Sequence, residues 1–123
     1  MPAGICCIAT STNRMLLLRR SELVDRPLVW AFPAGGIDYD EDPVEAAFRE
    51  FGEETGYWGD LDVEDMVIYP SGYDYFHCVV ATSPAEFKVD LNWENDLAGW
   101  FSVDELPSPL HPGVKTLLRL VGS

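Results

Sequence analysis

Short apolar runs near the N-terminus alternate with polar turns. Residues 4–9 and 15–19 are almost entirely apolar, and the polar stretch at 11–13 separates them. Runs of this length bounded by turn residues predict β-strands. A third apolar run at 28–32 predicts another strand, and the Pro-Ala-Gly-Gly sequence at 33–36 is predicted to end it as a loop.

One amphipathic helix is predicted over residues 43–55. Asp42 is a favourable N-cap, Pro43 suits the first helical position, and Glu45 completes a capping box. Gly56 can end the helix in a left-handed conformation. Residues suited to burial recur every three or four positions and define one inner face. They are Val44, Ala47, Phe48, Phe51 and Thr55.

The second half of the chain predicts more strands and a closing helix. Apolar runs indicate strands at 61–69 and 73–81, joined as a hairpin, a short strand at 87–89, and a strand at 97–101. A capping-box pattern predicts a helical turn at 102–105, and a proline opens a predicted helix at 112–120. We therefore expect an α/β fold with a mixed central sheet, helices on its faces, and one domain spanning residues 1–123.

The charge of the chain limits its partners. The net charge is −13, from 21 acidic and 8 basic residues, so binding to duplex nucleic acid is disfavoured. A small nucleotide can still bind where a divalent cation and a few arginines invert the local charge. No apolar run reaches the roughly 18 residues of a membrane span. The N-terminus lacks a basic secretory start, so we expect the true start of a cytoplasmic protein.

The cysteines and histidines give weaker indications. Cys6, Cys7 and Cys78 lie in apolar runs without metal-binding spacing, so we expect reduced core thiols. His77 and His111 each stand alone in the sequence, and we expect a structural or surface role for both.

The predicted helix carries a concentration of negative charge. Glu50, Glu53 and Glu54 share one helix face, where like charges repel. Arg49 offsets part of this negative charge. Glu41 precedes the helix and can fold back toward the same acidic site. A divalent cation such as Mg²⁺ or Mn²⁺ would offset the rest. A solvated acidic face is the alternative, but the preceding glycine loop would let main-chain carbonyls approach the same cation.

These residues form a motif that resembles the Nudix box, in which a glycine and a glutamate precede an R-E-x-x-E-E-x-G core at fixed distances. The matching positions are Gly35, Glu41, Arg49, Glu50, Glu53, Glu54 and Gly56. Residues 30–35, 100–107 and 111–114 are also similar to stretches seen in that family. The chain departs from the usual pattern at four positions, which are Ala34, Asp40, Phe51 and Tyr57.

The resemblance implies an α/β/α sandwich and a metal-dependent enzyme. Such an enzyme hydrolyses a phosphoanhydride bond in a nucleoside diphosphate derivative, either a nucleoside triphosphate or a dinucleoside polyphosphate, with Mg²⁺ or Mn²⁺. A non-catalytic Nudix-like module that binds a nucleotide as a sensor is the alternative. A Nudix-fold isomerase acting on an allylic diphosphate is a third reading, but it implies a longer chain. A homodimer is an open expectation.

The resemblance also implies roles for individual residues. The implied metal ligands are Glu53 and Glu54, Glu50 as ligand or base, and a main-chain carbonyl of Ala34 or Gly35. Arg49 is expected to orient Glu50 or Glu53, and Glu41 to support the cluster. Glu94, in the loop before the strand at 97–101, is expected as metal ligand or base, with a surface acid as the alternative.

Substrate contacts are expected outside the motif. Arg20 resembles an arginine that contacts substrate phosphate in that family. The alternative is a solvated surface arginine. Tyr73 and Tyr75 resemble a tyrosine of dinucleoside polyphosphate hydrolases. The alternative is that both are strand tyrosines that pack on a sheet. Trp30, Tyr73 and Tyr75 are also candidates for stacking on a base.

Overall fold

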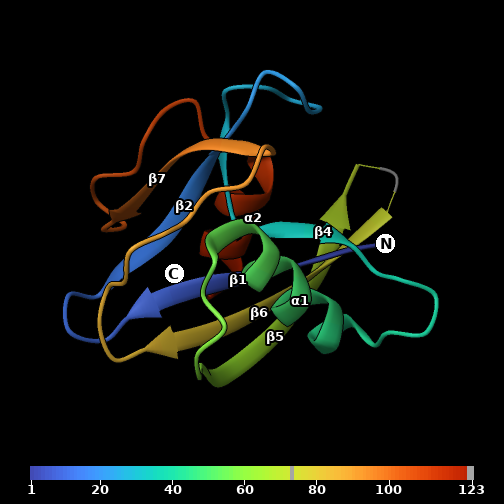
Figure 1. The fold of residues 1–123 in the computed structure, drawn as a ribbon, viewed down its shortest axis with the longest axis horizontal. Helices are drawn as coiled ribbons and strands as arrows, with labels where there is room; N and C mark the ends of the chain where they lie inside the picture. Colours follow the sequence, from blue (N-terminus) through green and yellow to red (C-terminus); the bar gives the residue numbers. More distant parts are fainter. Residues whose placement is uncertain (73, 122–123) are drawn as a thin grey trace.

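The computed structural model describes residues 1–72 and 74–121, and within these ranges seven strands form one sheet with two helices packed on it (Figure 1). In chain order the elements are β1 (Pro2–Ala9), β2 (Arg14–Arg20), β3 (Trp30–Ala31), β4 (Ala34–Gly36), α1 (Pro43–Thr55), β5 (Asp62–Ser71), β6 (Asp74–Ser83), β7 (Asn95–Phe101) and α2 (Pro112–Val121).

The sheet is mixed, as predicted. Its order is β3-β2-β1-β6-β5, β7 pairs with β2, and β4 pairs with β1. The β1–β6 pair is parallel, whereas the other strand pairs are antiparallel. One edge of β1 is shared by two partners, because Ile8 and Ala9 pair with β2 while Pro2 to Gly4 pair with β4. The sheet therefore forks beside β1, and β4 separates from β2 at this fork.

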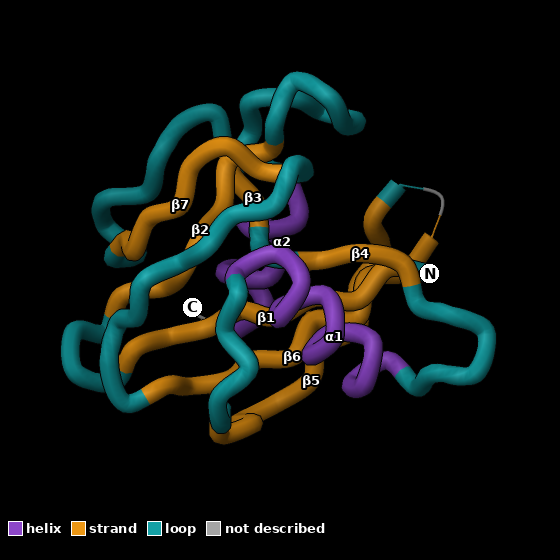
Figure 2. Tube along the Cα trace, viewed as in Figure 1, coloured by secondary structure: helices purple, strands orange, loops and turns teal. Residues whose placement is uncertain are grey.

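The two helices cover opposite faces of the sheet (Figure 2). Apolar residues of the strands alternate between the faces, so each helix closes its own core. The α1 core contains Ala3, Ile5, Cys7, Leu16, Leu18, Ala46, Ala47, Phe51, Val79 and Ala81. The α2 core contains Cys6, Met15, Leu17, Phe32, Tyr69, Phe76, Cys78, Val114 and Leu117. This arrangement is the expected α/β/α sandwich.

The predicted helix at 43–55 is confirmed at both ends. The Asp42 carboxylate accepts a hydrogen bond from the Glu45 backbone N–H at 2.9 Å, and the Glu45 side chain completes the capping box. Gly56 ends α1 in the left-handed region with φ 74°. Its N–H donates to the Gly52 carbonyl at 2.9 Å. Local capping and periodicity were therefore sufficient to predict this helix.

The prediction was wrong for the segment that enters the helix. Only Trp30 and Ala31 of the expected strand at 28–32 are extended in the sheet, because Leu28 has φ 61° and its N–H bonds to the Arg20 carbonyl. The predicted loop at 33–36 instead contains β4, which pairs with β1.

Of two other short predicted elements, the strand at 87–89 is absent and the turn at 102–105 is present. Residues 87–89 are irregular and lie outside the sheet, and the ring of Phe87 stacks on Tyr57 at a centroid distance of 4.0 Å. Residues 102–105 form the predicted turn, which is closed by a 3.0 Å hydrogen bond from the Glu105 N–H to the Ser102 carbonyl. Across residues 1–72 and 74–121, no helix is long and apolar enough to cross a membrane.

We predict that Gly56→Ala destabilises the fold by about 1–3 kcal/mol. A side chain at φ 74° is strained, and the new Cβ would lie 2.9 Å from the Cβ of Asp90. Urea unfolding measures the loss. Gly36→Ala is the matched control, because a Cβ there meets nothing within 4 Å. Equal losses in the two variants would contradict the argument.

Candidate functional site

The acidic face of α1 is divided between the interior and the surface. Glu50 and Glu54 lie one helical turn apart and are 9% and 4% exposed. The side chain of Glu53 points toward the rim and is 44% exposed. Helix geometry places the three residues on one face, but packing buries only the pair four residues apart.

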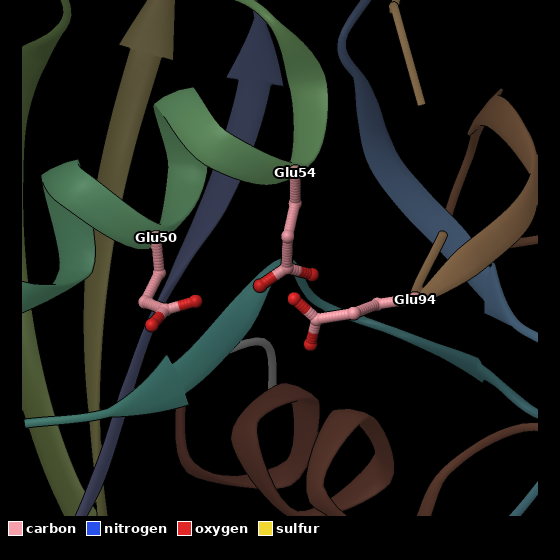
Figure 3. A group of neighbouring side chains, drawn as sticks. All are labelled: Glu50, Glu54 and Glu94. Carbon is pink, nitrogen blue, oxygen red and sulfur yellow. The ribbon is translucent and has the colours of Figure 1, made fainter. Parts of the chain in front are cut away.

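A third carboxylate reaches the buried pair from another part of the chain. Glu94, in the loop before β7, points toward Glu50 and Glu54 (Figure 3). One carboxylate oxygen from each of the three residues lies within 4.8 Å of the other two. We call these three residues the carboxylate cluster. It contains two of the acids expected from the helix, whereas the carboxylate of Glu53 lies outside it.

The loop that carries Glu94 is held by specific hydrogen bonds. The Glu94 N–H donates to the Asn92 side-chain oxygen at 3.1 Å, and the Ser21 N–H donates to the Glu94 carbonyl at 2.9 Å. The next residue, Asn95, donates from Nδ2 to Oε1 of Glu54 at 3.0 Å. The end of β2 and the start of β7 therefore place Glu94 against α1.

The electrostatics of the cluster fit a bound cation. Burial, first of all, and the neighbouring carboxylates of Glu94 and Glu50 raise the pKa of Glu54 to about 9, against the lowering effect of the Asn95 hydrogen bond. Within the described part of the chain, Oε2 of Glu54 is buried without a hydrogen-bond partner. Such an orphaned oxygen beside two more carboxylates is the hard donor set that Mg²⁺ and Mn²⁺ favour.

Arg49 organises the outer side of the site. Its Nε and Nη2 donate to both oxygens of Glu41 at 2.6 and 2.9 Å. Its Nη1 donates to Glu50 at 2.9 Å and to Glu53 at 3.1 Å, and Nη2 also reaches the Gly36 carbonyl. Arg49 lowers the pKa of Glu41, and Glu41 is the main cause of the raised pKa of Arg49. The planar guanidinium thus ties the loop before the helix to the helix acids.

Gly35 lies directly against the cluster. It sits on β4 opposite Ala3 of β1, and a Cβ at this position would collide with the Glu50 carboxylate. Glycine is therefore required here because the strand approaches the carboxylate closely, and not because the backbone is left-handed. Ala34 precedes it on the same strand.

A cavity of about 180 Å³ adjoins Gly35 on the α2 side of the sheet. Its wall is largely apolar, and its polar side chains include Arg20 and His111. The lining residues are Pro2, Arg20, Ala31, Phe32, Ala34, Gly35, Tyr69, Ser71, Phe76, His111, Gly113 and Val114. The sequence pointed to Arg20 but not to His111, for which the only local signal was a histidine before the proline that opens α2.

The aromatic candidates lie in different surroundings. Trp30 packs edge-to-face on Phe101 at a centroid distance of 5.2 Å, against the α2 core. Tyr75 is 54% exposed on β6. Tyr73 falls outside the described residues.

Comparison with known proteins places these features in a family. A family model described as the NUDIX domain matches residues 1–121. An RNA pyrophosphohydrolase from Bartonella tribocorum is 49% identical over 44 residues, which cover 36% of this chain and 25% of that protein. The chain thus matches only about a quarter of that relative's length.

Two further similarities extend over nearly the whole chain. Human diphosphoinositol polyphosphate phosphohydrolase 3-alpha is 28% identical over 98% of this chain and 78% of its own length. The crystal structure of a C. elegans Ap4A hydrolase superposes with a TM-score of 0.80 at 23% identity, covering 98% of this chain and 94% of that one. The structural likeness supports the fold.

We predict that the metal-free protein loses stability as the pH rises from 7 to 8.5. The folded-state pKa of Glu54, about 9, lies above its value of 4.5 in the unfolded chain, so the folded state binds one more proton between these values. The free energy of unfolding then falls by at most about 1.4 kcal/mol per pH unit. Thermal unfolding in EDTA at a series of pH values measures this loss of stability. Glu54→Gln should flatten the slope, whereas the exposed Glu105→Gln should keep it.

We also predict that Gly35→Ala weakens cation binding and destabilises the fold by about 1–3 kcal/mol, because the new Cβ displaces the Glu50 carboxylate. Calorimetric titration with Mn²⁺ and thermal unfolding measure the two effects. Gly36→Ala, where a Cβ meets open space, is the control. Unchanged Mn²⁺ affinity in Gly35→Ala would show that the cation does not depend on the position of Glu50.

Proposed function

The chain belongs to the NUDIX domain family, and we propose that it hydrolyses a phosphoanhydride bond in a nucleoside diphosphate derivative with the help of a divalent cation. The observation that carries the proposal is the convergence of Glu50, Glu54 and Glu94, with an unpartnered buried oxygen on Glu54. An acidic surface alone does not explain why a half-buried carboxylate from a distant segment meets the buried Glu54.

We assign the cation, Mg²⁺ or Mn²⁺, to the carboxylate cluster. When bound, it would neutralise phosphate oxygens and lower the pKa of a coordinated water. A main-chain carbonyl of Ala34 or Gly35 is a further proposed ligand, supported by the contact of Gly35 with Glu50. The motif also assigns Glu53 to the cation, but its carboxylate is bonded to Arg49 in the structure.

The remaining proposed roles are those of the general base and of a positioning residue. Arg49 engages one oxygen of Glu50 and leaves the other for a ligand or for a proton from water. Glu94 is the second candidate base, because it belongs to the cluster without an arginine partner in the part of the chain that the structure describes. Glu41 acts through Arg49 as a positioning residue.

Substrate recognition is proposed from the cavity. Arg20 is the proposed contact for substrate phosphate, because it lines the cavity beside Gly35. Tyr75 stays a candidate for stacking on a base, since much of its ring is exposed. The packing of Trp30 on Phe101 favours a structural role for that ring.

The substrate class, the cellular location and the assembly of the chain are also proposals. We propose a small nucleotide substrate and no duplex nucleic acid, because of the net charge of −13. We propose a cytoplasmic location, for which the three free, buried cysteines are support. The single domain and the homodimer are kept as hypotheses.

A substrate panel tests the activity. The protein is incubated with Mg²⁺ or Mn²⁺ and a nucleoside triphosphate, a dinucleoside polyphosphate or a short RNA carrying a 5′-triphosphate, and the products are separated by chromatography. We expect metal-dependent cleavage of at least one compound. If none is cleaved while a nucleotide still raises the melting temperature, the sensor module replaces the enzyme.

We predict that Glu54→Gln lowers metal-dependent turnover by about a hundredfold or more, because it removes a charge that holds the cation. Circular dichroism should show an intact fold, and Glu105→Gln is the exposed control. We expect Glu53→Gln to lose turnover as well. If Glu53→Gln retains the turnover of the parent protein while Glu54→Gln does not, Glu53 is only a partner of Arg49.

A further inference from the structure

One end of the cavity beside Gly35 is positively charged in a chain that is otherwise strongly acidic. Arg14, Arg19 and Arg49 each bond to carboxylates. Arg20 and Arg26 have no ion pair with any residue in 1–72 or 74–121. Nε of Arg20 donates to the Asp25 main-chain carbonyl at 2.6 Å, which fixes the guanidinium and leaves its two Nη groups.

His111 stands at this charged end in a fixed orientation. It occupies the N-cap position of α2, where its Nδ1 accepts a hydrogen bond from the Gly113 N–H at 2.9 Å. Its carbonyl accepts from the Val114 N–H at 3.0 Å. The Tyr69 hydroxyl donates to the Gly113 carbonyl at 2.9 Å, so this turn is also tied to β5.

The role of Nδ1 as an acceptor determines where the ring carries its proton. A neutral imidazole has one acceptor nitrogen and one N–H donor, so Nε2 is the donor here. Burial, Arg26 and Arg20 lower the pKa of His111, which keeps the ring neutral at pH 7. The cavity is therefore lined by an arginine without an ion pair and by an imidazole that offers a fixed N–H.

We propose that Arg20 and the Nε2–H of His111 bind an anionic phosphate group of the substrate in this cavity, which makes His111 a substrate-binding residue. The Arg20 guanidinium in the cavity wall calls for negative charge, which an uncharged nucleobase does not supply. The apolar walls from Phe32, Phe76 and Val114 lower the local dielectric constant and strengthen such an ionic contact. The substrate assignment rests on the function proposed above.

The two histidines of the chain make the binding step directly observable. A sample labelled with ¹⁵N in histidine is titrated with inorganic pyrophosphate in EDTA, and His111→Ser identifies the His111 signals. We expect saturable shifts of these signals with Nε2 still protonated, and binding weakened about tenfold in Arg20→Gln. Arg119→Gln removes an exposed cation of α2 outside the cavity and should bind as the parent protein does.

Other outcomes of the titration overturn the proposal. If adenosine shifts the His111 signals and pyrophosphate does not, the cavity binds a base instead of a phosphate group. If neither compound shifts them, the cavity is not a subsite. Both results are independent of turnover, so they leave the proposed hydrolysis standing.

Kinetics of two substitutions separate recognition from helix capping. His111→Ser keeps a hydroxyl acceptor for the Gly113 N–H but is too short to reach into the cavity. We expect a KM about tenfold higher, a kcat within about twofold and an unchanged melting temperature. His111→Ala should raise KM equally and also cost about 1 kcal/mol of stability through loss of the cap.

The same kinetics distinguish failure of the phosphate contact from failure of the proposed hydrolase activity. An unchanged KM in His111→Ser, with turnover in the parent protein, overturns the phosphate contact and leaves the enzyme. Absence of turnover in the parent protein with saturable pyrophosphate binding overturns the hydrolase and leaves the anion subsite.

Discussion

Repulsion among buried carboxylates is the constraint around which this site is built. Arg49 offsets the outer acids, Glu41, Glu50 and Glu53, through a planar set of hydrogen bonds. Glu54 and Glu94 receive no such bond from an arginine or lysine in the described residues, and Asn95 supplies only a neutral donor to Glu54. The inner half of the cluster therefore keeps an excess of negative charge, which a divalent cation can remove.

The forked sheet brings this charge to one place. Because β4 takes over one edge of β1 from β2, Gly35 lies against the Glu50 carboxylate of α1, and together with Ala34 it also lines the cavity on the α2 side. The absence of a side chain at Gly35 is what allows Glu50 to be buried there. The end of β2 then anchors the Glu94 loop through Ser21, so that one strand contributes to both the cluster and the cavity.

The sequence predicted the parts of the structure that depend on local signals. The cap at Asp42, the apolar periodicity and Gly56 specify α1 within the segment itself. The extents of β3 and β4 could not be predicted, because both depend on pairing with distant strands. The helix periodicity could not decide between Glu53 and Glu54, because burial depends on what packs above the helix. The place of His111 in the cavity wall could not be predicted, because Arg20 and Phe76, which line the cavity with it, are distant in the sequence.

The separation of the two cores has a consequence for how substrate preference changes. The carboxylate cluster is carried by α1 and the loop before β7, whereas the wall of the cavity comes from the strands and from the start of α2, and Gly35 is a residue that touches both. Substitutions that share no partner act almost independently on free energy. The cavity wall can therefore diverge over evolutionary time, and with it the choice of ligand, while the carboxylate cluster stays unchanged.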